Sequence, residues 1–168
     1  AQEESLARSS GLFATLDGHP MYEHHRAQRD PIYTDWMLVS PAVPFFRTDE
    51  GALLDRIWTA GVLTAPAVNA KVVLGRDPSR TAEVGTVMAR RIDRVLAIAA
   101  AEGYRTLVLG AWGCGAFGND PAVIAPLFGA ALHGPFAGVF DHVVFAVLDW
   151  TKDHRIIGPF QAAISTPA

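Results

Sequence analysis

The chain has 168 residues, of which half are hydrophobic and only 18% are charged, so we expect one compact domain over 1–168 with a sizeable core. The formal net charge of −3 argues against a broad basic face, so no direct binding of nucleic acid is expected. A single cysteine excludes an internal disulfide framework, and no apolar run is long enough to suggest a membrane span, which together favour a cytoplasmic protein.

The first third of the chain predicts helices followed by strands. Leu6, Phe13 and Leu16 fall close to one helical stripe and predict a helix over 2–16. A short helix is expected over 21–28, before Asp30 and Pro31. The β-rich runs 36–40 and 57–64 predict strands that end at "SPAVP" and "TAPAVN", with a turn or excursion in "FFRTDEGALLD" between them.

The rest of the chain alternates helix and strand. A long helix is predicted over 82–102, with apolar residues at spacings of three and four on one side and Arg90, Arg91 and Arg94 on the other. Gly103 ends it, a buried strand follows over 106–109, and Pro121 begins another helix. "DHVVFAVLD" predicts a further strand. This order predicts an α/β fold with a largely parallel or mixed sheet covered by helices.

Two adjacent carboxylates, Glu3 and Glu4, stand almost at the start of the chain. Acidic residues in the first turn of a helix are common, because unpaired backbone amides and the helix dipole favour negative charge there by roughly 0.3 to 1 kcal/mol. The pair therefore has two interpretations from sequence alone: helix-capping charge, or the acid group of an enzyme.

The glycine-rich loop after the strand 106–109 is a candidate anion site. Ligands of open α/β sheets bind at the carboxyl ends of strands, glycines let backbone amides approach an anion closely, and the helix that follows adds its positive end. "GCGAFG" also has the letters of the dinucleotide pattern Gly-x-Gly-x-x-Gly, with Asp141 at a broadly similar distance to the expected acidic residue. That alternative is weak, because the pattern lies late in the chain.

Cysteine and histidine offer little chemistry by pattern. Cys114 lies in the loop, where a thiol near a helix start is sometimes a nucleophile, but no histidine is paired with it by sequence, so a structural or ligand-lining role is favoured. His24 and His25 are adjacent and point to different sides of a helix, and no pair has zinc-site spacing, so solvent-facing histidines and no metal are expected. No cofactor is expected either.

"AQEESLARSSGL", "TAPAVN", "GAWGCGAFGNDP" and the element order together resemble the bacterial-type poly(ADP-ribose) glycohydrolases, over nearly the whole chain. The resemblance implies a three-layer macrodomain-like mixed sheet flanked by helices, in a single catalytic domain. The family signature is a triple-glycine loop, a short spacer and Gln-Glu-Glu. Gln2, Glu3 and Glu4 match its second half, whereas the triple glycine does not occur in these residues, so we expect the domain to lack its N-terminal segment.

The same resemblance implies roles for individual residues. The family cleaves the ribose–ribose O-glycosidic bond of poly(ADP-ribose), which needs a proton for the departing oxygen. Glu4 would be the general acid and then the base that activates water, while Glu3 would hold the ribose hydroxyls. A bound diphosphate would raise the pKa of the acid. The residues expected to bind substrate are Gln2, Gly113, Cys114, Gly115, Ala116, Phe117 and Gly118, with Phe117 packing on the distal ribose.

Three functions remain open at this point. The first is a glycohydrolase that releases ADP-ribose from polymer. The second is a non-catalytic ADP-ribose-binding macrodomain, since the same fold often only binds. The third is a hydrolase of another ADP-ribosyl linkage. In each case we expect a monomer whose ligands are poly(ADP-ribose) or ADP-ribose and whose partners are ADP-ribosylated proteins.

Overall fold

The computed structural model describes residues 2–165, which form helices and strands in two compact units. The first unit comprises residues up to 29 together with 34–66, and the second comprises 30–33 together with the chain from 67 onward. The α/β class predicted from sequence is confirmed, with one antiparallel and one parallel strand pair among the described residues. The prediction of a single domain concerns the packing of the two units and stays a prediction.

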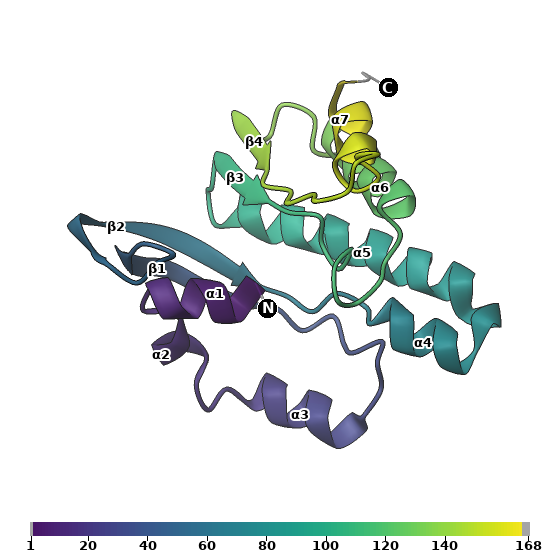
Figure 1. The fold of residues 1–168 in the computed structure, drawn as a ribbon, viewed down its shortest axis with the longest axis horizontal. Coiled ribbons are helices and arrows are strands. Elements are labelled where there is room, and N and C mark those ends of the chain that lie inside the picture. Colours follow the sequence, from purple (N-terminus) through teal and green to yellow (C-terminus); the bar gives the residue numbers. More distant parts are fainter. Residues whose placement is uncertain (1, 166–168) are drawn as a thin grey trace. The chain divides into compact units, whose positions relative to one another are not determined.

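The first unit is a β-hairpin with short helices (Figure 1). Its elements are α1 (Gln2–Ser9), α2 (Leu12–Leu16), α3 (Pro20–Gln28), β1 (Leu38–Arg47) and β2 (Leu53–Thr64). The helix predicted over 2–16 is in fact two helices. Ser10 causes the break, because its hydroxyl donates to the Leu6 carbonyl (2.6 Å) and accepts the Leu12 amide (3.2 Å), while its backbone bridges to Phe45 of β1.

Strand β1 is longer than predicted, because "SPAVP" lies inside it rather than ending it. Proline is compatible with a strand at a sheet edge or a bulge. Both conditions hold here, since the sheet has two strands and its register shifts between Ser40 and Val43. The predicted turn is confined to 48–52, because the two ends of "FFRTDEGALLD" belong to β1 and β2. The hydrophobic core of this unit is formed by Leu12, Leu16, Met21, Leu38, Val43 and Phe45.

The second unit contains the other elements (Figure 1). They are α4 (Ala70–Arg76), the 3₁₀ turn η1 (Pro78–Arg80), α5 (Thr81–Ala101), β3 (Thr106–Leu109), α6 (Pro121–His133), β4 (His142–Phe145) and α7 (Ile157–Ser165). Strands β3 and β4 pair in parallel, with Thr106 opposite His142. Neither α4 nor α7 was predicted from the sequence.

Helix α5 packs with the predicted apolar face, and the side chains of Val84, Met88, Ile92, Val95 and Ala99 are all buried. The predicted position of Arg91 is wrong. Arg91 was predicted to lie with Arg90 and Arg94 on the side of the helix opposite the apolar residues, yet it is completely buried and its Nη2 donates to the Ile32 carbonyl at 2.8 Å. A buried guanidinium is tolerated where its donors find acceptors.

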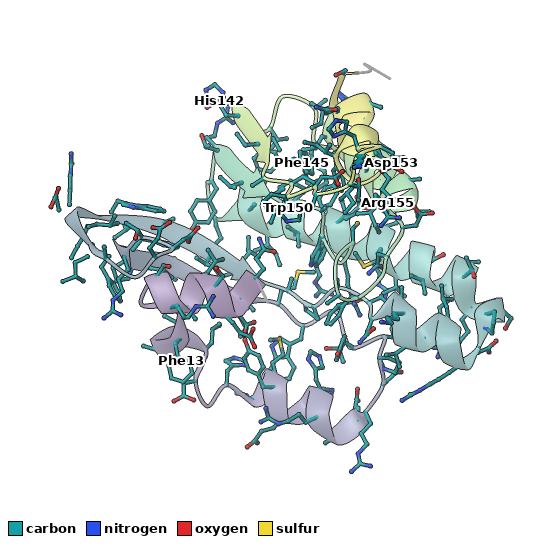
Figure 2. The ribbon with its side chains drawn as sticks, in the orientation of Figure 1. Phe13, His142, Phe145, Trp150, Asp153 and Arg155 are labelled. Atoms are coloured by element: carbon teal, nitrogen blue, oxygen red, sulfur yellow. The ribbon has the colours of Figure 1, made fainter. Side chains whose placement is uncertain are left out.

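An aromatic cluster joins β4 to the last two helices. Phe145 contacts Phe128 of α6 and Phe160 of α7, each with ring centroids 5.3 Å apart. Figure 2 labels Phe145, together with Trp150, Asp153 and Arg155 of the segment that leads to α7. Helices α6 and α7 approach closely at Gly129, where a Cβ would lie 2.9 Å from the Ala163 carbonyl oxygen.

Candidate active site

The first turn of α1 presents Gln2, Glu3 and Glu4, all exposed. Tyr22 of α3 donates its hydroxyl hydrogen to Glu3 Oε2 at 2.9 Å. Partial burial, together with the hydrogen bond to Glu3 and its negative charge, raises the pKa of Tyr22. Tyr22 therefore stays protonated at neutral pH and orients one Glu3 oxygen. Its role was not predicted from the sequence, where its only signal is its place in a neighbouring helix.

Glu4 is oriented differently from Glu3, because adjacent residues project about 100° apart on a helix. Among the described residues, the positive charge of Arg8 contributes to lowering the pKa of Glu4, and water screens this effect because the carboxylate is fully exposed. The raised pKa expected beside a bound diphosphate depends on the charge of that ligand and stays a prediction.

The glycine-rich loop follows β3 and turns twice within ten residues. The Cys114 amide donates to the Ala111 carbonyl (2.9 Å) and the Gly118 amide donates to the Gly115 carbonyl (3.0 Å). Gly113 and Gly118 have φ of 76° and 67°, in the left-handed region that favours glycine. The loop therefore depends on glycine at these two positions for its shape.

Between these turns lie three consecutive amides that suit an anion. No acceptor is found within residues 2–165 for the backbone amides of Gly115, Ala116 and Phe117, and Gly115 and Ala116 are exposed. Consecutive amides in a loop form a concave site of positive partial charge, which is the arrangement that binds phosphate. This arrangement supports the anion-binding role predicted for 113–118.

Asn119 stabilises the loop through hydrogen bonds. Its side-chain amide donates to the carbonyls of Val68 (2.8 Å) and Gly113 (3.1 Å). The backbone amide of Asn119 also donates to the Gly113 carbonyl (3.0 Å). It is almost completely buried. On the other side, the Lys71 amide of α4 donates to the Phe117 carbonyl at 2.8 Å. Neither contact was predicted from the sequence, although Asn119 directly follows "GCGAFG".

Cys114 is half-buried, and its thiol donates to the Trp112 carbonyl. Burial, and then the negative charge of Asp120, raise the pKa of the Cys114 thiol to about 12. The thiol is therefore neutral at physiological pH, and a neutral thiol is a poor nucleophile. The structural or ligand-lining role favoured by sequence agrees with this chemistry.

The start of α6 differs from the expected anion-binding helix end. Asp120 caps it, with Oδ1 accepting the Ala122 amide at 2.9 Å. A carboxylate in this position neutralises the positive end of the helix. The loop amides, rather than the helix dipole, are therefore the better donors to an anion.

The histidines of α3 differ from one another. His24 is exposed, as predicted, but His25 is half-buried and its Nε2 lies 2.8 Å from Thr34 Oγ1 and accepts the Thr34 amide at 3.3 Å. Residues 2–165 contain no group of three or more His, Cys, Asp or Glu side chains placed to hold a metal ion. Nor does any helix in that range have the length and apolar character needed to cross a membrane.

Comparison with known proteins shows the family. A family model described as microbial-type PARG, catalytic domain, matches residues 1–48. A crystal structure of a poly(ADP-ribose) glycohydrolase mutant from Deinococcus radiodurans in complex with ADP-ribose is 42% identical, with a TM-score of 0.93, over 100% of this chain and 69% of that one. The enzyme from Thermomonospora curvata bound to the inhibitor ADP-HPD is 49% identical, with a TM-score of 0.88, over 96% of this chain and 62% of that one.

No relative was found among curated proteins. The fold and the site define an α/β protein with exposed carboxylates and a glycine-rich loop whose amides suit an anion. The structural matches are more specific, because they extend over at least 96% of the chain at more than 40% identity. The chain belongs to the bacterial poly(ADP-ribose) glycohydrolase family, which consists of glycosidases with a macrodomain-like fold.

Proposed function

We propose that this protein hydrolyses the ribose–ribose O-glycosidic bonds of poly(ADP-ribose) and releases ADP-ribose, with Glu4 as general acid and base. The observation that carries the proposal is the 42% identity over the whole chain to a poly(ADP-ribose) glycohydrolase in complex with ADP-ribose. The enzyme acts without a cofactor, as a cytoplasmic monomer, on ADP-ribosylated proteins. Its free cysteine is consistent with a reducing compartment.

The chemistry assigns different tasks to the two carboxylates. Glu4 gives its proton to the departing ribose oxygen and then, as a carboxylate, takes a proton from the attacking water. Glu3 accepts hydrogen bonds from ribose hydroxyls, and Tyr22 supports this task because it already holds one Glu3 oxygen. A facing pair of carboxylates is not required, since one proton donor and one positioning group suffice for this scheme.

The diphosphate of ADP-ribose is assigned to the glycine loop. The amides of Gly115, Ala116 and Phe117 are the donors, and the exposed positions of Gly115 and Ala116 leave room for the phosphates. The Phe117 ring then packs on the distal ribose. Under this scheme the loop holds the diphosphate, and Glu4 protonates the departing oxygen of the terminal acetal.

Glu4→Gln tests the assignment directly in the full-length protein. We expect release of ADP-ribose from polymer to fall by about 10² to 10⁴, the usual contribution of a general acid–base group. The dissociation constant for ADP-ribose should change less than about 3-fold, because glutamine keeps the size of the side chain. Glu23→Gln, an exposed glutamate of α3, is the matched control and should match the wild type.

The alternatives give different results in the same assays. A protein that binds ADP-ribose but never shortens polymer is a reader, and one that removes ADP-ribose only from side chains or nucleic acid hydrolyses another linkage.

Because Glu4 must carry a proton in the acid step, turnover should decrease as pH rises through its pKa in the complex. A pH profile with no such limb contradicts the assigned role.

A further inference from the structure

The ring of Phe117 packs against Tyr33, which belongs to the second unit although it lies far earlier in the chain. The two rings are stacked, with centroids 6.0 Å apart and planes 28° from parallel. Both side chains are half-buried. Aromatic pairs in this separation range attract one another by about 0.5 to 1.5 kcal/mol beyond the area they bury.

The segment that carries Tyr33 is fixed on two sides. The Asn69 amide at the start of α4 donates to the Pro31 carbonyl at 2.9 Å. The buried guanidinium of Arg91 donates to the Ile32 carbonyl at 2.8 Å. A hydrogen bond from a charged donor in a dry environment is strong. The backbone on the N-terminal side of Tyr33 is therefore held by residues of two different helices.

Tyr33 itself has an unusual backbone conformation. Its φ is 61°, in the left-handed region, and its amide donates to the Asp30 carbonyl at 3.0 Å in a tight turn. A residue with a Cβ is disfavoured there, and such conformations persist only where the surroundings enforce them. The turn, the Asn69 contact and the Arg91 contact together enforce this one, and its result is the position of the Tyr33 ring.

A contact with α4 holds the backbone of Phe117 but not its ring. The Lys71 amide binds the Phe117 carbonyl at 2.8 Å, which sets the backbone but leaves the torsions of the side chain free. The glycines nearby in the loop add no side-chain atoms that would limit the ring. Within residues 2–165, Tyr33 is the aromatic residue on which the Phe117 ring stacks, and this contact favours one orientation of the ring.

We propose that Tyr33 is a positioning residue, which acts through Phe117 to align the distal ribose for cleavage. The proposal rests on the proposed function, since it takes the Phe117 ring to pack on that ribose. A small misplacement of a reacting group lowers the rate steeply, on the order of 10²-fold for about 1 Å. Diphosphate binding uses backbone amides, so loss of Tyr33 affects kcat more than KM.

The Tyr33→Gly variant distinguishes the effect of the Tyr33 ring on catalysis from an effect on the stability of the fold. Glycine adopts a positive φ without strain, so this change removes the ring while relieving the backbone. We expect kcat for ADP-ribose release to fall about 10-fold, with KM within about 3-fold and an unchanged midpoint of unfolding. Tyr33→Phe keeps the ring and should restore kcat to within about 2-fold of the wild type.

The matched control is His154→Gly, which makes the same backbone change at another residue with positive φ (53°), one that is exposed. It should leave kcat unchanged. If His154→Gly lowers kcat as much as Tyr33→Gly, or if Tyr33→Gly equals the wild type, the proposal is overturned. A Tyr33→Phe variant as slow as Tyr33→Gly also overturns it, because the hydroxyl rather than the ring would then matter.

A double-mutant cycle tests whether the effect passes through Phe117. In a Phe117→Ala background, Tyr33→Gly should change kcat by less than about 2-fold, and additive effects contradict the proposal. If the wild-type protein releases no ADP-ribose, the proposed function fails by itself. The cycle is then measured on ADP-ribose dissociation constants, where Tyr33→Gly should weaken binding about 3-fold only when Phe117 is present, and equal effects in both backgrounds overturn the proposal.

Discussion

Gly113 is the residue of the loop whose environment leaves no room for a side chain. A Cβ there would contact Asn119 Nδ2 and lie 2.8 Å from the Ala67 Cβ, and its φ of 76° is already unfavourable for other residues. We predict that Gly113→Ala lowers the free energy of unfolding by about 2 to 4 kcal/mol, from backbone strain and overpacking together. Urea denaturation measures this change.

Gly115→Ala is the control for stability, because Gly115 lies in the same loop without a positive φ, and a Cβ there would have nothing within 4 Å. It should change the free energy of unfolding by less than about 0.5 kcal/mol, as surface substitutions usually do. If both variants are destabilised equally, the close contact between Asn119 and Gly113 is not what excludes a side chain at position 113.

Single residues were predictable where their role is local. Pro121 and Gly103 act on their own turn of helix, and both predictions are confirmed by the bounds of α6 and α5. Arg91 and Asn119 bond to carbonyls 59 and 51 residues away, respectively. No spacing along the chain encodes such partners, so Arg91 was assigned with two other arginines to the side opposite the apolar face. The roles of Glu3, Glu4 and 113–118 in catalysis and binding stay predictions.

At the scale of elements, length and periodicity decided what was predictable. Helix α5 is long and amphipathic, and its predicted bounds of 82–102 are close to the observed Thr81–Ala101. Helices α4 and α7 are short. The start of α7 is held by the carboxylate of Asp149, eight residues earlier, rather than by an adjacent capping residue. The break between α1 and α2 depends on the pairing of Ser10 with β1. At this break a tertiary contact overrides local propensity.

The carboxylate of Asp149 organises the segment that leads into α7. Oδ1 accepts from the amide and hydroxyl of Thr151 (2.8 and 2.6 Å), and Oδ2 accepts the amides of Ile156 and Ile157 (both 2.9 Å). These hydrogen bonds, that of the Thr151 hydroxyl first, lower the pKa of Asp149 well below its usual range. The carboxylate therefore stabilises the fold while it is ionised.

Asp149→Asn tests this role, because an amide nitrogen cannot accept and two of the four bonds are lost. We predict a lower midpoint of urea denaturation and faster hydrogen exchange at the start of α7, with Asp153→Asn, an exposed neighbour, as the control. A depressed pKa contributes stability above the unfolded pKa, about 3.9, that is lost as pH falls through the folded value. The difference between wild type and Asp149→Asn should therefore shrink in acid, and a difference independent of pH contradicts the assignment.

At the scale of the whole molecule, the proposed function assigns different groups of ADP-ribose to residues of different units. Glu3 and Glu4 belong to the first unit and the loop 113–118 to the second. ADP-ribose carries a diphosphate and, beyond it, the distal ribose that the carboxylates are proposed to bind. A ligand that lacks the distal ribose, such as ADP, should therefore engage the second unit alone. This difference makes the proposed arrangement testable without measuring catalysis.

Hydrogen exchange with each ligand provides that test. With saturating ADP-ribose, we predict at least about 3-fold slower exchange for amides of both the loop 113–118 and α1, since binding suppresses local opening. With saturating ADP, only the loop should be protected. The Glu4→Gln protein should give the same two patterns, because the substitution removes proton transfer rather than binding. Protection of the loop but not of α1 by ADP-ribose would mean that the carboxylates do not reach the ligand, and Glu4 would then lose its assigned role even if the protein cleaves polymer.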